Sequence, residues 1–241
     1  MKKLLCIVIT LCLLLCGCGS TKSPEATETA PAALQEQPET TETETVPEET
    51  QPERSVVLGK LEGNTYTNEY MGYGCVFGSG WDVYGADVLQ ELPANVAEML
   101  QGTEAGDVIE KYTQITDMLA ENLEDLTTVN VVYTKLGLQE RLAYALMGEK
   151  EILEQVLGQQ DMLMESYAAA GIHVSDMELV TVAFLGQERY AIHTTATMQE
   201  VPYYILQIYD YHLASYGVVT TFASFIEDNT ASLPAMFYSI G

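Results

Sequence analysis

Positive charge and histidine are scarce in this sequence. Of its 241 residues, ten are Lys or Arg and three are His, against 35 Asp or Glu, so the formal net charge is −25. Nucleic-acid binding depends on Lys and Arg placed against phosphates, and adsorption to an anionic bilayer depends on basic clusters. The charge therefore argues against both partners. It permits metal cations or basic partners without requiring either, and a solvated acidic surface is the simplest interpretation.

Recognisable catalytic motifs are also missing. The sequence has no His-Glu-x-x-His, no Gly-x-Ser-x-Gly, no phosphate-binding glycine loop and no EF-hand spacing. Its histidines, His173, His193 and His212, form no metal-binding pair, and His193 on its expected strand is more typical of a hydrogen-bonded structural residue. Acidic residues are so frequent that no pair of them stands out. We expect no cofactor and no metal, with loose Ca²⁺ binding by an acidic turn left open.

Cysteine is nearly absent after residue 18, and no apolar run is long enough to cross a membrane. Only Cys75 lies beyond Cys6, Cys12, Cys16 and Cys18. Residues 4–15 form an apolar run after Lys2 and Lys3. A transmembrane helix needs roughly 20 apolar residues, whereas the apolar core of a secretory signal needs only ~7–15. The first residues therefore predict a signal peptide.

The stretch Leu15-Cys16-Gly17-Cys18 resembles the bacterial lipobox. In lipoproteins that carry this motif, the cysteine at the position of Cys18 receives a diacylglycerol, and the signal is cut before it. The resemblance implies a signal peptide over residues 1–17 and a lipid anchor on the outer face of a bacterial cell membrane, because two acyl chains bind a bilayer durably. An ordinary signal peptide and an uncleaved short anchor are the alternatives. With the lipobox, Cys75 is the one free thiol left, so no internal disulfide can form.

Residues 18–54 join this anchor to the rest of the chain. After Cys18 they are rich in Thr, Glu and Pro and contain almost no large apolar side chain. Such a composition cannot bury enough apolar surface to offset chain entropy, so we expect a disordered tether. Residues 55–241 then have the length of one domain.

The pattern of residues 55–241 predicts an α+β fold. A sheet with helices on one face fits the order of elements, and the other face then needs cover or a partner. Residues 114–122 fit either helix or strand. Strands are expected over 55–61, 65–70, 71–78, 127–136, 177–185, 189–198, 201–211 and 217–226, and helices over 92–100, 103–112, 138–147, 149–170 and from a start between 228 and 232.

Two strands have informative faces. In residues 71–78 the large side chains alternate with glycines, so Cys75 is expected in the core, and Trp81 or a helix is expected over the bare face. In residues 201–211, Tyr203, Tyr209 and Tyr211 share one face. That face is either a half-covered side of the sheet or a recognition surface, since tyrosine is enriched at interfaces. We take these three tyrosines as a candidate partner surface.

Three segments carry a further resemblance. The runs YTNEYMGYGCVFGSGWDVYG, TTVNVVYTKL and RYAIHTTATM resemble those of uncharacterised lipoproteins from Gram-positive gut bacteria, whose domain is similar to the PsbP-like α/β sandwich. The resemblance spans most of residues 62–240. It implies an antiparallel sheet flanked by helices, a strand over 114–122 in a hairpin with 128–135, and a non-catalytic, partner-binding module.

The resulting hypothesis is a lipid-anchored extracytoplasmic module that binds a protein or a component of the cell envelope without catalysis. Two alternatives stay open. One is an envelope hydrolase that uses acidic residues, for which a cleft with two facing, partly buried acids would be expected. The other is a small-ligand capture protein, for which an apolar pocket lined by tyrosines would be expected.

Overall fold

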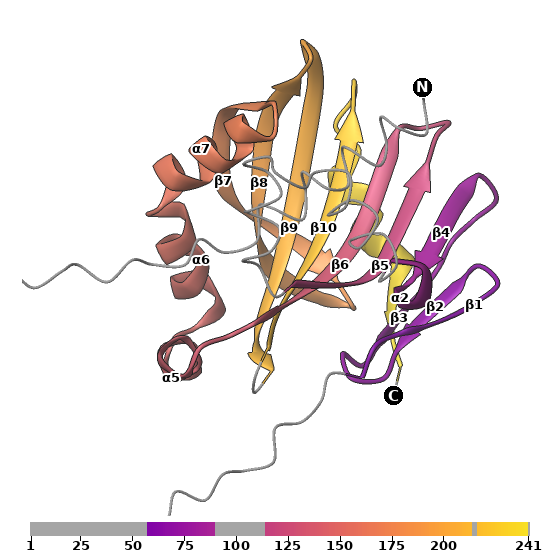
Figure 1. Cartoon of the computed structure of the whole chain (residues 1–241), viewed down its shortest axis with the longest axis horizontal. Coiled ribbons are helices and arrows are strands. Elements are labelled where there is room, and N and C mark those ends of the chain that lie inside the picture. The colour runs from indigo at the N-terminus through magenta and orange to yellow at the C-terminus, as the bar shows by residue number, and fades with distance from the viewer. Residues whose placement is uncertain (1–56, 90–113, 214–215, 241) are drawn as a thin grey trace, which may run out of the picture.

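The computed structural model describes residues 57–89, 114–213 and 216–240. A seven-stranded antiparallel sheet forms its centre (Figure 1). Residues 114–122 form one of its strands and pair with the next strand as a hairpin, as the family resemblance implies. In sheet order the strands are β4 (Trp81–Gly85), β5 (Gln114–Asn122), β6 (Thr127–Lys135), β10 (Tyr216–Phe225), β9 (Val201–Leu213), β8 (Gln187–Met198) and β7 (Ile172–Phe184).

A second, four-stranded sheet covers one face of the first, which the sequence analysis did not foresee. Its order is β1 (Lys60–Glu62), β2 (Thr65–Asn68), β3 (Tyr73–Val76) and β11 (Phe237–Ser239). The strand β11 thus pairs with β3, which lies near the start of the described residues. Cys75 is buried in the core between the sheets, as predicted, together with Tyr73 and Phe77. The predicted α+β class with antiparallel strands is confirmed, and the face of the large sheet that needed cover is covered by a second sheet that was not predicted.

Helices cover the other face of the large sheet, over β7, β8 and β9 (Figure 1). They are α5 (Leu138–Leu146), α6 (Glu149–Leu157) and α7 (Gln160–Ala169), and a short α2 (Ala86–Leu89) lies elsewhere, beside β5. The helix predicted over 149–170 is broken in two at Gly158, since glycine is a poor helix former and an effective stop. Gly171, with φ of +78°, ends α7 as predicted.

The C-terminal region corrects two expectations. The last helix is a 3₁₀ turn, η1 (Thr230–Met236), which Pro234 keeps short, and the chain then enters β11. Tyr238 on β11 lies opposite Gly74 of β3, and a Cβ added at Gly74 would stand 2.7 Å from the Tyr238 hydroxyl. Tyr238 therefore covers the bare glycine, whereas Trp81 packs against Phe77.

One ion-pair network fixes α6 to the large sheet. Arg189 on β8 contacts Glu149 at 2.6 Å and Asp210 of β9 at 3.0 Å, and all three side chains are mostly buried. Burial acts to lower the pKa of Arg189, but the charges of Asp210 and Glu149 outweigh it, and the pKa is raised. The network holds the N-terminal end of α6 over the sheet, where negative side chains are also favourable.

The helices expected over 92–100 and 103–112 lie outside the described residues, as do the segments predicted to form the signal peptide and tether. Within the described ranges, no helix has the length and apolar character needed to span a bilayer.

Candidate functional site

The structure buries the candidate partner surface. Tyr203, Tyr209 and Tyr211 are 0, 4 and 5% exposed beneath the helices. Tyr203 stacks on Phe225 at 4.4 Å, and Tyr211 stacks on Tyr144 of α5 at 4.5 Å. These tyrosines belong to the core between sheet and helices, so the prediction of an exposed recognition surface is wrong. Cys18, the predicted lipid site, lies outside the described residues.

His193 has the structural role that its strand position predicts. Its Nε2 lies 2.9 Å from Asp228 Oδ2, beyond the end of β10, and its Nδ1 lies 3.7 Å from Glu178 on β7. Burial acts to raise the pKa of Asp228, but hydrogen bonds from Thr230 and the proximity of His193 lower it overall. The histidine therefore ties the segment before η1 to the large sheet.

The most polar buried cluster centres on Asp117. The strand register moves from Thr116 paired with Val132 to Met118 paired with Val131, so Asp117 is the extra residue of a β-bulge. The bulge turns its carboxyl toward the small sheet. There Oδ1 accepts a bond from the Gly59 N–H (2.7 Å), and Oδ2 accepts bonds from Tyr66 (2.5 Å) and Asn68 (2.6 Å).

The hydrogen bonds of this cluster connect the large sheet to the small sheet. Asp117 is fully buried, as are the side chains of Tyr66, Asn68 and Tyr133 around it. Burial raises the pKa of Asp117, although the hydrogen bonds from Tyr66, Gly59 and Asn68 oppose the shift. Because no solvent reaches these groups, the cluster suits stability rather than catalysis.

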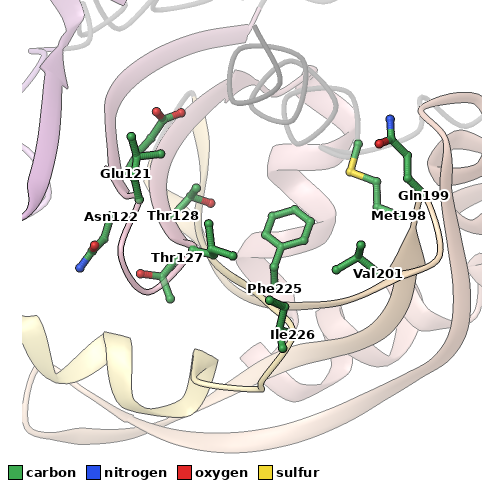
Figure 2. A pocket seen from close by; sticks show the side chains of 11 residues that line it. Glu121, Asn122, Thr127, Thr128, Met198, Gln199, Val201, Phe225 and Ile226 are labelled. Atoms are coloured by element: carbon green, nitrogen blue, oxygen red, sulfur yellow. The ribbon is translucent and has the colours of Figure 1, made fainter. Parts of the chain in front are cut away.

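An apolar cavity of about 260 Å³ opens at one end of the large sheet. Figure 2 shows β5 and β6 residues on one side, Met198, Gln199 and Val201 on the other, and Phe225 with Ile226 between them. Phe225 is held in place by its stacking on Tyr203. Eleven residues line the cavity: Glu121, Asn122, Leu123, Leu126, Thr127, Thr128, Met198, Gln199, Val201, Phe225 and Ile226.

The rim of this cavity is strained. Leu126, Gln199 and Ile226 line the cavity and have φ of 52°, 52° and 72°, and Glu200 beside them has 67°. Positive φ is unfavourable for side chains other than glycine, and most of all for a β-branched residue such as Ile226. Strained residues of this kind cluster at functional sites in proteins, although positive φ also occurs in ordinary strand turns, as at Leu185 between β7 and β8.

Backbone hydrogen bonds fix the strained rim. The Phe225 N–H donates to the Leu126 carbonyl (3.1 Å), and the Ile226 N–H donates to the Pro202 carbonyl (3.0 Å). Asn122 Oδ1 accepts from the backbone N–H of Glu124 at 2.9 Å. The three segments that form the rim are thereby joined, so the cavity is preformed.

Few polar atoms line the cavity. Among the described residues that line it, Glu121 is the one with a charged side chain. Thr127 and Thr128 are 2 and 9% exposed, and over the described part of the chain neither hydroxyl has a hydrogen-bond partner. The described residues contain no group of three or more His, Cys, Asp or Glu side chains that could hold a metal ion. The cavity is therefore suited to an apolar group with few hydrogen bonds.

Sequence reasoning missed this cavity. Its rim comes from three turns that are far apart in the chain, and the turn between β8 and β9 is Gln199-Glu200, without the glycine or asparagine that marks such turns. The available signal was an apolar residue beside an acidic one in each turn. The small-ligand alternative called for an apolar pocket lined by tyrosines. This pocket is apolar, and its described lining residues include no tyrosine.

Comparison with solved structures finds distant similarities, one of which is to a cyanobacterial protein. The solution structure of cyanobacterial PsbP (CyanoP) from Synechocystis sp. PCC 6803 is similar at 13% sequence identity, over 80% of this chain and 99% of that chain, with a TM-score of 0.37. No protein-family model matches the chain, and no curated protein matches it. The strand pairing of the two sheets defines the α+β sandwich.

Proposed function

We propose that this protein is a lipid-anchored, extracytoplasmic binding module of the bacterial cell envelope, and that the cavity at the end of the large sheet is its binding site. The anchor would be a diacylglycerol on Cys18, and residues 19–54 would form the tether. The partner would be a protein or another envelope component, and the module would carry no catalysis.

The observation that carries the binding site is the exposed apolar rim. Leu123, Leu126, Val201 and Ile226 are between 38 and 59% exposed, although they lie around a preformed apolar cavity. Removing apolar surface from water is favourable by roughly 25 cal/mol per Å². A bound partner that covers these exposed side chains would therefore gain binding free energy. The positive φ of Leu126 and Ile226 places these exposed apolar side chains beside the opening of the cavity.

Site-specific photocrosslinking tests the binding site. A benzophenone amino acid placed at Ile226 in cells should give a discrete adduct with an envelope component. The same group at Val76, an exposed valine of the small sheet, should give none. Equal adducts from both positions, or none from either, would contradict the proposal.

Metabolic labelling tests the anchor separately. Labelled palmitate should enter the wild-type chain and should not enter Cys18→Ala, which should also leave the membrane fraction. Labelling that persists in Cys18→Ala would reject the lipid attachment without affecting the test of the cavity.

A further inference from the structure

The described segments around the cavity are rich in acidic residues and contain no basic residue. The three segments that form its wall and rim, residues 121–128, 198–201 and 225–228, contain six Asp or Glu and no Lys, Arg or His. Asp228 is bound to His193, and Glu121 lies in the lining. The other four are exposed and form what we call the acidic rim: Glu124, Asp125, Glu200 and Glu227.

The acidic rim is held beside the apolar rim by the same backbone. Glu124 and Asp125 follow Leu123, Glu200 precedes Val201, and Glu227 follows Ile226. Asn122 fixes the first pair, since its Oδ1 accepts from both of their N–H groups. An occupant that fills the cavity therefore meets negative charge at every turn around the opening.

These features discriminate between kinds of occupant. An anion would face the acidic rim and Glu121 with no base in the three segments, so carboxylate and phosphate ligands are disfavoured. Roughly 150 Å³ of apolar cavity accommodates one benzene ring, so about 260 Å³ accommodates one large side chain. A free molecule of that size would leave the exposed Leu123, Leu126 and Ile226 uncovered, whereas a peptide backbone laid across the opening would cover them.

We propose that this end of the sheet binds a basic peptide segment of a partner protein. One aromatic or branched apolar side chain of the segment enters the cavity, and flanking Lys or Arg residues face the acidic rim. This inference rests on the proposed function, because it names the partner chemistry of the same site. It agrees with the net charge of −25, which attracts cationic partners over a distance.

Three matched peptides test the inference by calorimetry on the full chain in phosphatidylcholine nanodiscs. They are acetyl-KKFKK-amide, acetyl-KKAKK-amide and acetyl-EEFEE-amide. The first should bind about tenfold tighter than either of the others, because exposed ion pairs and one buried ring each supply a factor of this order. The preference over the acidic peptide should shrink at about 0.5 M salt, where charges are screened within roughly 4 Å.

Two sets of variants locate the binding energy. Val201→Trp fills the cavity and should abolish the preference for Phe over Ala, whereas Val76→Trp should not. Converting the four residues of the acidic rim to their amides should abolish the preference for the basic peptide. The matched control converts four exposed acids outside the three segments to their amides, and it should leave the preference unchanged. Like the acidic rim, this set has three Glu and one Asp: Glu69, Asp161, Glu165 and Glu188.

Neutral 2-phenylethanol separates this inference from the proposed function. If 2-phenylethanol binds in the cavity but the basic and acidic peptides bind equally, the partner chemistry is wrong and the binding site stands. If neither 2-phenylethanol nor any peptide binds, both proposals fail. If free phenethylammonium binds as tightly as the basic peptide, the site takes a small cation and the peptide inference is overturned.

Discussion

Replacing Asp117 with Asn should destabilise the protein by separating the two sheets. The amide oxygen of Asn can take the place of Oδ2 and keep the bonds from Tyr66 and Asn68. Its NH₂ group then faces the Gly59 N–H, which now donates to Oδ1 at 2.7 Å. One hydrogen bond is lost and a buried donor is left without an acceptor, so the free energy of unfolding should fall by about 2–4 kcal/mol.

Urea unfolding followed by tryptophan fluorescence measures this change. Trp81 is the one tryptophan, and it packs at 5.4 Å from the ring of Phe77, which follows β3 of the small sheet. Its emission should therefore respond when the sheets separate. Asp82→Asn, at an exposed position on the neighbouring strand, is the control and should change stability by less than about 0.5 kcal/mol. A similarly small effect from Asp117→Asn would refute the role of the cluster.

The difference in stability between the wild type and Asp117→Asn should depend on pH. Burial raises the pKa of Asp117 above its ordinary 3.8, so the unfolded chain releases this proton at a lower pH than the folded chain does. As pH rises from 3.8 through the folded-state pKa, the unfolded state is favoured and the contribution of Asp117 to stability decreases. The stability of the wild type minus that of Asp117→Asn should therefore be largest at acid pH. A difference that grows with pH would contradict the raised pKa.

Three further changes test the packing. Gly74→Ala should destabilise by about 1–3 kcal/mol, because its Cβ would lie 2.9 Å from the backbone oxygen of Tyr66 and 2.7 Å from the Tyr238 hydroxyl. Gly78→Ala has nothing within 4 Å and should be nearly neutral in the same urea titration. Arg189→Met removes both ion pairs that hold α6, so it should destabilise the protein by about 1–2 kcal/mol and lower its thermal midpoint. Equal midpoints in the wild type and the variant would show that the network contributes nothing. Burial raises the pKa of Cys75 to about 12, so this thiol should not react in the native protein. The wild type and Cys75→Ala should therefore consume equal amounts of thiol reagent when native, and the wild type should consume one equivalent more in denaturant.

The sequence predicts the strands well where side chains alternate and the burial pattern has one solution. The alternation in residues 71–78 correctly placed Tyr73, Cys75 and Phe77 in the core. It did not reveal what covers Gly74, because Tyr238 comes from the far end of the chain and reaches it only through the pairing of β11 with β3. Local patterns do not contain such long-range contacts.

The second sheet was missed for the same reason. Its strands contain only three or four residues each, and their pairing with a C-terminal strand that looked helical follows from tertiary packing. Tyr203, Tyr209 and Tyr211 show a different limit. Their shared face was read correctly, but periodicity does not say whether helices cover that face, and here they do.

The candidate site could not be predicted because its parts meet only at the end of the sheet. Leu126 and Ile226 are 100 positions apart in the sequence, and no local motif marks either of them. Their positive φ follows from the closure of the turns around Phe225. Strain of this kind is visible only in three dimensions.

Xenon binding tests the existence of the open apolar cavity most directly, since dry apolar cavities take up xenon. A crystal of the protein held under xenon pressure should show the atom between Met198, Val201 and Phe225, and crystals of Val201→Trp should show none there. If protein side chains instead fill this space in the wild type and no xenon enters, the cavity does not exist as described, and both the binding site and its partner chemistry are wrong.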